Sequence, residues 1–205
     1  MSYRWWSADI HANHANICIY CGRPWLRTTE LTEDQKWVSQ EAALACAARM
    51  NDGLVRNFNE RVAKNDQVVH VGDFSTSGKV NGISGLREPY TTFLSRLNGD
   101  WTLLTGNHDK QGKVKTIGQH LFAWVGGVPA FVTHRPTDDP RQDPELIEYV
   151  RKKCKFAIVG HVHKAWAVKR YDDGFLDINV GVDVRNYRPV RDDELIEIYG
   201  KETKT

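Results

Sequence analysis

Leu103-Leu104-Thr105-Gly106-Asn107-His108-Asp109 is the stretch that decides the fold. Its apolar start predicts a short buried strand, and Gly106 permits a sharp turn where that strand ends. An amide, an imidazole and a carboxylate therefore follow the carboxyl end of a strand, the edge of an α/β sheet where ligands usually bind. A single turn of this kind is also ordinary loop chemistry, so a site is indicated only where the pattern recurs.

The same arrangement, a buried strand followed by residues that can bind a metal, occurs at four further positions. These positions carry Asp9 and His11, Asp73, His134, and His161 with His163. Residues two apart on a strand share a face, so the first and last positions each offer a pair of ligands. Oxygen and imidazole donors without thiolates favour divalent ions such as manganese, iron, nickel or zinc. With Asn107 there are seven candidate ligands, too many for one tetrahedral ion and suited to two ions bridged by a carboxylate.

Helices alternate with strands in the first part of the chain, and hairpins follow. An apolar stripe predicts one long helix over 32–64, capped by Thr32 and weakest at Gly53. Further helices are expected over 86–97, 110–120 and 143–153, hairpins over 121–133 and 166–180, and a strand or short helix over 191–199. This order predicts an α/β fold with a mixed sheet, or two packed sheets, flanked by helices.

The chain has 205 residues, which suits a single domain over 1–205. Its formal charge of +2 is nearly balanced, so strong binding to duplex nucleic acid is not expected. No apolar stretch approaches the roughly 20 residues that span a bilayer, and the first residues lack a signal-peptide pattern, so we expect a cytoplasmic protein without membrane contact. Cys18 and Cys21 have C-x-x-C spacing but no second ligand pair, which favours inert free thiols over a zinc or redox role.

Two segments are expected to form the rim of the site. Residues 14–25 are too polar for a core, and residues 75–85, rich in glycine and serine, predict a flexible loop at the same edge. The candidate substrate contacts are His14, Arg23 and Arg135, with Lys79, Lys110 and Lys164 as further phosphate-binding charges and Trp25 and Tyr187 as rings that stack on a base. Each of these side chains also suits an ordinary role as a solvated charge or a packed ring.

The motifs Asp-x-His, Gly-Asp, Gly-Asn-His-Asp, a single His after a strand, and Gly-His-x-His occur in this order. From Asp9 to Asp183 the chain thereby resembles the calcineurin-like metallophosphoesterases, and 11–25 and 179–183 resemble a small single-domain bacterial and phage branch. The resemblance implies two packed mixed β-sheets flanked by helices. It also implies that one ion is held by Asp9, His11 and His163, that the second is held by Asn107, His134 and His161, and that Asp73 bridges them.

The activity implied by the resemblance is hydrolysis of a phosphoester with two divalent ions, manganese first, and iron, nickel or zinc as alternatives. The implied nucleophile is a hydroxide that bridges the ions, with His108 protonating the leaving oxygen and Asp109 orienting His108. By analogy we favour a phosphodiesterase acting on small or cyclic nucleotides. The open alternatives are a phosphomonoesterase such as a protein phosphatase, a nuclease on longer DNA or RNA, and a non-catalytic module that binds partners on a metal scaffold.

Overall fold

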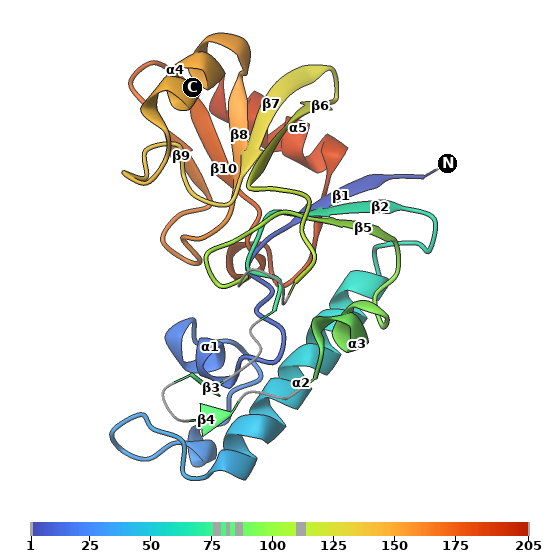
Figure 1. The fold of residues 1–205 in the computed structure, drawn as a ribbon, viewed down its shortest axis with the longest axis vertical. Helices are drawn as coiled ribbons and strands as arrows, with labels where there is room; N and C mark the ends of the chain where they lie inside the picture. The colour runs from blue at the N-terminus through green and yellow to red at the C-terminus, as the bar shows by residue number, and fades with distance from the viewer. Residues whose placement is uncertain (1, 76–78, 81–82, 85–87, 110–113, 205) are drawn as a thin grey trace.

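Two β-sheets packed against each other form the centre of the computed structural model, which describes residues 2–75, 79–80, 83–84, 88–109 and 114–204 (Figure 1). The first sheet has the order β11-β1-β2-β5, and its strands are Val190–Arg191, Arg4–Ser7, Gln67–His70 and Asp100–Leu103. The second has the order β6-β7-β8-β10-β9, and its strands are His120–Val125, Val128–Thr133, Phe156–Val159, Leu176–Asn179 and Val168–Arg170. The expected architecture of two mixed sheets is confirmed.

Parallel pairing places the carboxyl ends of three strands at one edge of each sheet. In the first sheet β1 pairs in parallel with β2, and β2 with β5. In the second sheet β7 pairs in parallel with β8, and β8 with β10. The sheets meet just beyond β1 and β10, where the Ala8 amide donates to the Val180 carbonyl at 3.1 Å and the Val182 amide donates to the Ala8 carbonyl at 3.1 Å. Loops that leave these strand ends therefore lie close together.

Alternating strand side chains build a core on each side of the sheets. Trp6 from β1 and Phe156 and Ile158 from β8 belong to the cluster between the sheets, where α5 (Asp192–Glu202) also packs. The outer face of the second sheet is covered by α4 (Pro144–Lys153). On the other side of the first sheet, α2 (Gln40–Asn59) and α3 (Tyr90–Leu94) pack beneath the strands (Figure 1).

The long helix expected over 32–64 is wrong at both ends, because α2 spans Gln40–Asn59. Helix α2 begins at Gln40, and Ser39, not Thr32, provides the cap, because the Ser39 hydroxyl accepts a hydrogen bond from the Ala42 amide at 3.2 Å. A turn of 3-10 helix at Thr28–Glu30 and a loop precede it. At Gly53 the helix continues, and the indole of Trp25 occupies the space that a Cβ atom would fill. That glycine therefore permits close packing.

Other elements differ less from the expectation. The hairpins and α4 are confirmed, and of the segment 191–199, Arg191 ends strand β11 and the rest is helical within α5. Helix α3 is shorter than 86–97, residues 114–119 are not helical, and residues 110–113 lie outside the described residues. Most of the loop 75–85 also lies outside them, apart from the short strands β3 (Lys79–Val80) and β4 (Ile83–Ser84).

Residues 14–25 are not the exposed rim that their polarity suggested. The segment contains a short helix, α1 (Ala15–Tyr20), that the sequence analysis missed, and it packs on α2. Two asparagines in and beside it are paired inside the protein: the Asn51 amide nitrogen donates to Asn13 Oδ1 at 2.7 Å, and the Trp37 indole donates to Asn16 Oδ1 at 2.7 Å. Polar composition failed as a guide to exposure here because the partners of these groups lie in other segments.

All four cysteines are buried free thiols, as expected. Among the described residues, no helix is both long and apolar enough to cross a membrane.

Candidate metal centre

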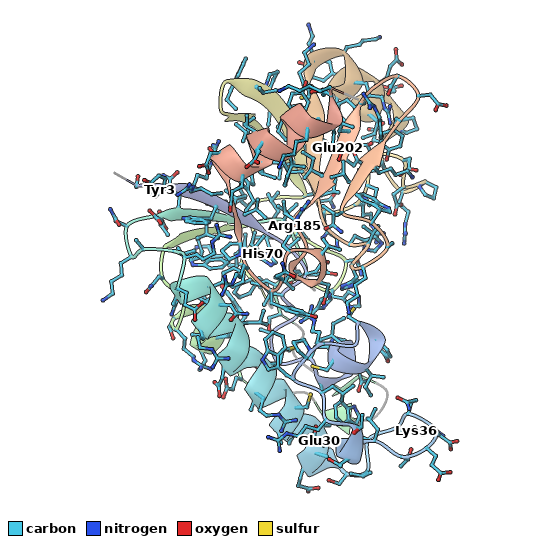
Figure 2. All side chains as sticks on the ribbon, turned by 180° about the vertical axis from the view of Figure 1, so that it is seen from behind. Tyr3, Glu30, Lys36, His70, Arg185 and Glu202 are labelled. Carbon is cyan, nitrogen blue, oxygen red and sulfur yellow. The ribbon has the colours of Figure 1, made fainter. Side chains whose placement is uncertain are left out.

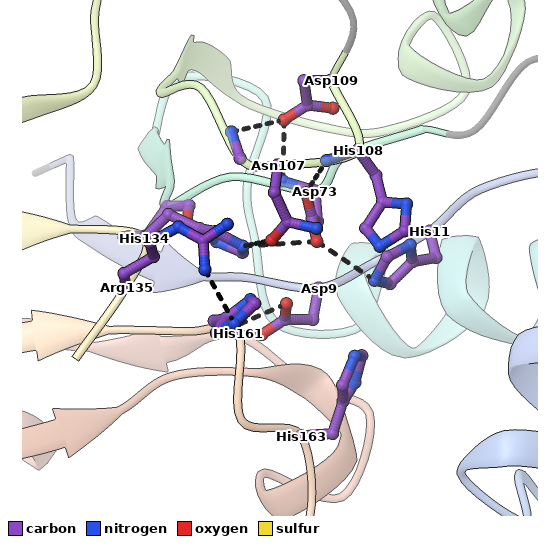
Figure 3. Close-up of polar contacts among 12 residues, drawn as sticks. Asp9, His11, Asp73, Asn107, His108, Asp109, His134, Arg135, His161 and His163 are labelled. Atoms are coloured by element: carbon purple, nitrogen blue, oxygen red, sulfur yellow. Dashed lines mark hydrogen bonds and ion pairs between the residues drawn. The ribbon is translucent and has the colours of Figure 1, made fainter. Parts of the chain in front are cut away.

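The loops after the strands bring the predicted ligands together (Figure 3). Ligand atoms of Asp9, His11 and His163 lie within 4.8 Å of one another, as do those of Asp73, His134 and His161. The first set follows β1 and β8, and the second follows β2, β7 and β8. These are the two groupings that the resemblance implied, with Asp73 counted in the second.

Asp73 lies between the two groups. Its Oδ2 atom is 3.5 Å from His11 Nε2 on one side and 3.2 Å from His134 Nε2 on the other. Its Oδ1 atom accepts a hydrogen bond from the His108 amide at 2.7 Å, which fixes the carboxylate in this position. One oxygen that faces both groups is the arrangement a bridging ligand requires.

The surroundings of His134 fit a divalent cation. Its Nδ1 atom lies 2.8 Å from the Val71 carbonyl oxygen, so the ring donates its proton there. Its Nε2 atom then faces two more acceptors, Asn107 Oδ1 at 3.1 Å and Asp73 Oδ2. Burial opposes protonation of this ring, but the hydrogen bond with Asp73 and the nearby carboxylates raise its pKa, so without a metal Nε2 carries a proton toward these oxygens. A divalent cation between the three groups would take the place of that proton.

Burial and neighbouring charges shift the ligand pKa values in opposite directions. Burial raises the pKa of Asp9 to about 6 and lowers that of His161 to about 4. Burial also opposes ionisation of Asp73, but the hydrogen bond with His134 and the nearby histidine charges hold its pKa well below the usual range. Carboxylates in so dry a site need a nearby positive charge, which divalent ions supply.

The carboxylate of Asp183 holds the ring of His163. The Nδ1 atom of His163 donates to Asp183 Oδ2 at 2.8 Å, and the hydrogen bond directs Nε2 away from Asp183. Burial opposes protonation of this ring, yet the bond with Asp183 raises its pKa to about 10. Cys21 lies in the same group of potential ligands. The sequence did not predict this role for Asp183. The only sign of it was that Asp183 belongs to the stretch 179–183, which resembles a branch of the family.

Arg23 does not lie where substrate can reach it, so that prediction is wrong. The residue is 1% exposed, and its Nε and Nη2 atoms donate to the two oxygens of Asp183 at 2.9 and 3.0 Å. It also donates to the carbonyls of Asp9 and Ile10 at 2.7 and 2.9 Å. Arg23 therefore positions Asp183 and the loop that carries Asp9.

Asp109 holds backbone rather than the His108 ring. Its carboxylate accepts hydrogen bonds from the amides of Asp73, Phe74 and Gly106 at 2.7, 3.0 and 2.9 Å. Asp109 thus joins the loop of Asp73 to the loop of Gly106. The resemblance implied that Asp109 orients the His108 ring, but these contacts hold backbone amides instead. The ring of His108 lies beside that of His11, with 5.1 Å between centroids.

Five of the predicted ligands have a left-handed backbone, which side chains other than glycine rarely adopt. The φ angles are 58° at Asp9, 49° at His11, 58° at Asp73, 71° at His161 and 45° at His163. Such conformations cost of order 1–3 kcal/mol each and persist where the surrounding structure enforces them for function. Five of the nine described residues other than glycine with this conformation are predicted ligands, so the strain is concentrated at the site.

Two glycines let the ligand loops approach one another. A Cβ atom on Gly72, whose φ is 92°, would lie 2.6 Å from the ring of His134. A Cβ on Gly106 would overlap the backbone nitrogen and the carboxylate of Asp73. The Gly-Asp and Gly-Asn-His-Asp motifs therefore carry glycine for close packing as well as for turning.

The remaining candidate substrate contacts divide into three cases. Trp25 and Tyr187 pack against each other, with 4.8 Å between centroids, so their expected stacking on a base is replaced by mutual packing. Arg135 is half-buried, and its Nη1 atom lies 3.2 Å from Asp139 Oδ2 and 3.1 Å from His161 Nε2. His14 and Lys164 line a cavity described below, whereas the Lys79 side chain and Lys110 lie outside what the structure describes.

Two cavities adjoin the ligands. The α1 cavity, of about 370 Å³, is lined by His11, His14, Ile17, Tyr20, Cys21, His108, His163 and Lys164. The β7 cavity, of about 480 Å³, is more polar, and its lining includes Asn107, His120, His134, Arg135, Arg141 and Gln142. The α1 cavity is thus next to the first ligand group and the β7 cavity next to the second.

The chain belongs to the calcineurin-like phosphoesterase superfamily, because residues 50–190 match the model of that family's domain. The resemblance is confirmed, and the family places the chain among the phosphoester hydrolases. An uncharacterized protein of Methanocaldococcus jannaschii is 29% identical over 199 residues, which are 95% of this chain and 89% of that protein.

Two solved structures are similar to this chain. A protein of unknown function from Aquifex aeolicus matches with a TM-score of 0.63 at 19% identity, over 97% of this chain and 100% of that chain. A phosphoesterase from E. coli matches with a TM-score of 0.43 at 16% identity, over 86% of this chain and 77% of that chain. The match to the Aquifex aeolicus protein supports the architecture.

Proposed function

We propose that this protein is a phosphodiesterase that uses two divalent ions, manganese first, to hydrolyse diesters of small nucleotides. The observation that carries the proposal is the convergence of the two ligand groups on Asp73. Family membership supports the hydrolase class, and the number of ions, their identity and the substrate are our inference.

The proposed reaction assigns a separate role to the ions, to the residues that hold the ligands and to His108. When bound, the two ions would activate water at neutral pH and neutralise charge on the phosphoryl oxygens. Asp183 holds the ring of His163, and Asp109 holds the loops of Asp73 and Gly106, so the ligands are fixed before substrate arrives. His108, exposed beside the first ligand group, is placed to give a proton to the departing oxygen.

The two cavities favour a diester over a monoester. A phosphodiester carries two organic groups on one phosphorus, and a cavity adjoins each ligand group. A monoester would leave one of these cavities unused. The nearly balanced charge of the chain argues further for a small substrate rather than a long nucleic acid.

Metal-stripped protein assayed with bis(4-nitrophenyl) phosphate and 4-nitrophenyl phosphate tests the proposal. Manganese, iron, nickel, zinc and magnesium are added back separately. We expect manganese to restore activity, with kcat/KM at least about tenfold higher for the diester. Faster turnover of the monoester would identify a phosphomonoesterase. Stoichiometric metal without turnover of either ester would contradict the enzymatic function itself.

A further inference from the structure

The α1 cavity contains side chains that the metal ligands do not account for. Ile17 and Tyr20 from α1 and Lys164 from the loop after β8 line it, and none of them belongs to a ligand group. Its volume of about 370 Å³ lies within the ~300–1,000 Å³ that is usual for small-molecule sites. A chemically distinct pocket therefore opens directly beside the first ligand group.

His14 is the clearest sign that the α1 cavity binds a polar molecule. Its side chain is 5% exposed, and among the described residues neither ring nitrogen has a hydrogen-bond partner. The ring lies beside those of His11 and Tyr20, with centroids 5.7 and 6.4 Å away. A buried imidazole without partners is unfavourable, and a bound group that offers a donor or an acceptor would satisfy it.

His70 is a useful contrast. It is also fully buried, and among the described residues its ring nitrogens lack partners too, but it lines neither cavity. Figure 2 labels His70 inside the molecule, and its ring packs edge-on against Phe74 with 5.0 Å between centroids. The position of His14 on a cavity wall is what makes a ligand contact available to it.

The lining limits the chemistry of the ligand. Among the described residues no carboxylate lines the α1 cavity, which disfavours a cationic alcohol. Ile17 and the ring of Tyr20 suit contact with a flat, weakly polar group. The two nitrogens of His14 suit hydrogen bonds with a hydroxyl of that group or with polar atoms at the edge of its ring. A nucleoside combines an uncharged flat base, which has hydrogen-bonding atoms at its edge, with the hydroxyls of the sugar.

The position of His108 assigns a direction to the reaction. His108 lines the α1 cavity and is not part of the lining of the β7 cavity. A group bound in the α1 cavity therefore has its ester oxygen near the proposed proton donor. The substituent on the side of the β7 cavity, near Arg135 and Arg141, stays attached to phosphorus.

We propose that the α1 cavity binds a nucleoside as the leaving alcohol of the diester, with His14 as its hydrogen-bonding partner. The nucleoside site stands on the cavity and His14, and the leaving-group assignment rests on the proposed function. In the reaction, water supplies the oxygen that bonds to phosphorus. The bond between phosphorus and the nucleoside oxygen breaks, its electron pair goes to that oxygen, and the oxygen takes one proton; the second proton of water goes to the phosphate product or solvent.

Binding of the nucleoside is tested without turnover. Adenosine is titrated into the protein while the ring signals of the histidines are followed by NMR, with His14 assigned from the His14→Gln variant. We expect saturable shifts of the His14 signals and none of the His70 signals. No shift at His14 up to about 10 mM adenosine would overturn the site, whatever the hydrolase assays show.

The direction of cleavage is tested with the methyl diester of adenosine 5′-phosphate and manganese-loaded protein. Both alcohols are primary, so the pocket rather than leaving-group chemistry decides which bond breaks. We expect adenosine and methyl phosphate as the main products, whereas mainly adenosine 5′-phosphate and methanol would overturn the assignment. If neither product pair forms and bis(4-nitrophenyl) phosphate is hydrolysed, the pocket assignment is wrong; if that ester is also inert, the proposed function fails.

Variants of His14 and His70 distinguish a loss of nucleoside binding from a general effect on folding. His14→Phe should lower the ratio of adenosine to methanol release by about tenfold, since one neutral hydrogen bond is lost. His14→Gln, which keeps a donor and an acceptor, should preserve most of the ratio, and the matched control His70→Phe should leave it unchanged. An unchanged ratio in His14→Phe, or the same fall in His70→Phe, would remove His14 from this role.

Discussion

His163 Nδ1 and Asp183 Oδ2 are 2.8 Å apart, and the two oxygens of Asp183 are in turn held by the buried guanidinium of Arg23. The carboxylate thereby selects the ring tautomer whose Nε2 atom is available to an ion. Arg23 also holds the carbonyls of Asp9 and Ile10, so one buried network connects ligands that follow β1 and β8.

Asp183→Asn should weaken one metal site selectively. The carboxylate accepts three hydrogen bonds, two from Arg23 and one from His163, whereas an amide would turn its NH2 group toward one of these donors. The tautomer of His163 is then no longer fixed. We expect the affinity for one ion to fall by about 10–100-fold in a competition titration against a chelating dye. Asp173→Asn, in an exposed ion pair with Arg151, is the control. Equal affinities in wild type and Asp183→Asn would show that the carboxylate does not tune the ligand.

Gly106→Ala should disrupt the centre without touching a ligand. The added Cβ would overlap the backbone nitrogen and carboxylate of Asp73. We expect a loss of at least about 100-fold in kcat/KM on bis(4-nitrophenyl) phosphate, because small displacements of the ligands are costly. Gly200→Ala in α5 is the matched control, since a Cβ there meets nothing within 4 Å. Similar losses in both variants would rule out this steric explanation.

His70 should make the protein sensitive to acid. Burial lowers the pKa of His70 from 6.5 to about 3, so between these values the unfolded chain binds a proton that the folded chain does not. Its stabilising contribution is therefore complete above pH 6.5 and is lost as the pH falls toward 3. Urea unfolding of metal-free protein at about pH 7 and about pH 4.5 should show a smaller acid loss for His70→Phe than for wild type. The same loss in both proteins would contradict this assignment.

Local sequence patterns predicted the metal ligands, but not Arg23 and Asp183, which hold those ligands in place. Each metal ligand follows a short apolar strand and a tight turn, a signal contained within a few residues such as Val71-Gly72-Asp73. The parallel pairing of these strands then brings the ligands together. Arg23 and Asp183 are 160 residues apart in the chain, so no local pattern could pair them.

The errors in the fold have the same physical origin. Trp37 fits the apolar stripe of α2 by spacing, yet it lies before the helix, where its indole bonds to Asn16. Polar residues such as Asn13 are buried because their partner, Asn51, arrives from α2. Periodicity and polarity describe a segment alone, whereas these positions are decided by contacts between segments.

His108→Ala should affect esters according to their leaving group. If His108 gives a proton to the departing oxygen, its loss slows esters of alkyl alcohols by about 10²–10⁴-fold and nitrophenyl esters much less. Rates on the methyl diester of adenosine 5′-phosphate and on bis(4-nitrophenyl) phosphate provide the comparison. Equal losses on both substrates would exclude His108 as the proton donor.

The central claim is that Asp73 joins two ions in one site. Native mass spectrometry of manganese-loaded wild type and Asp73→Ala measures this directly, with circular dichroism to confirm that the variant is folded. We predict that the wild-type chain binds two manganese ions and that the folded variant binds at most one. A wild-type chain that binds only one ion, or a variant that keeps both, would contradict the account.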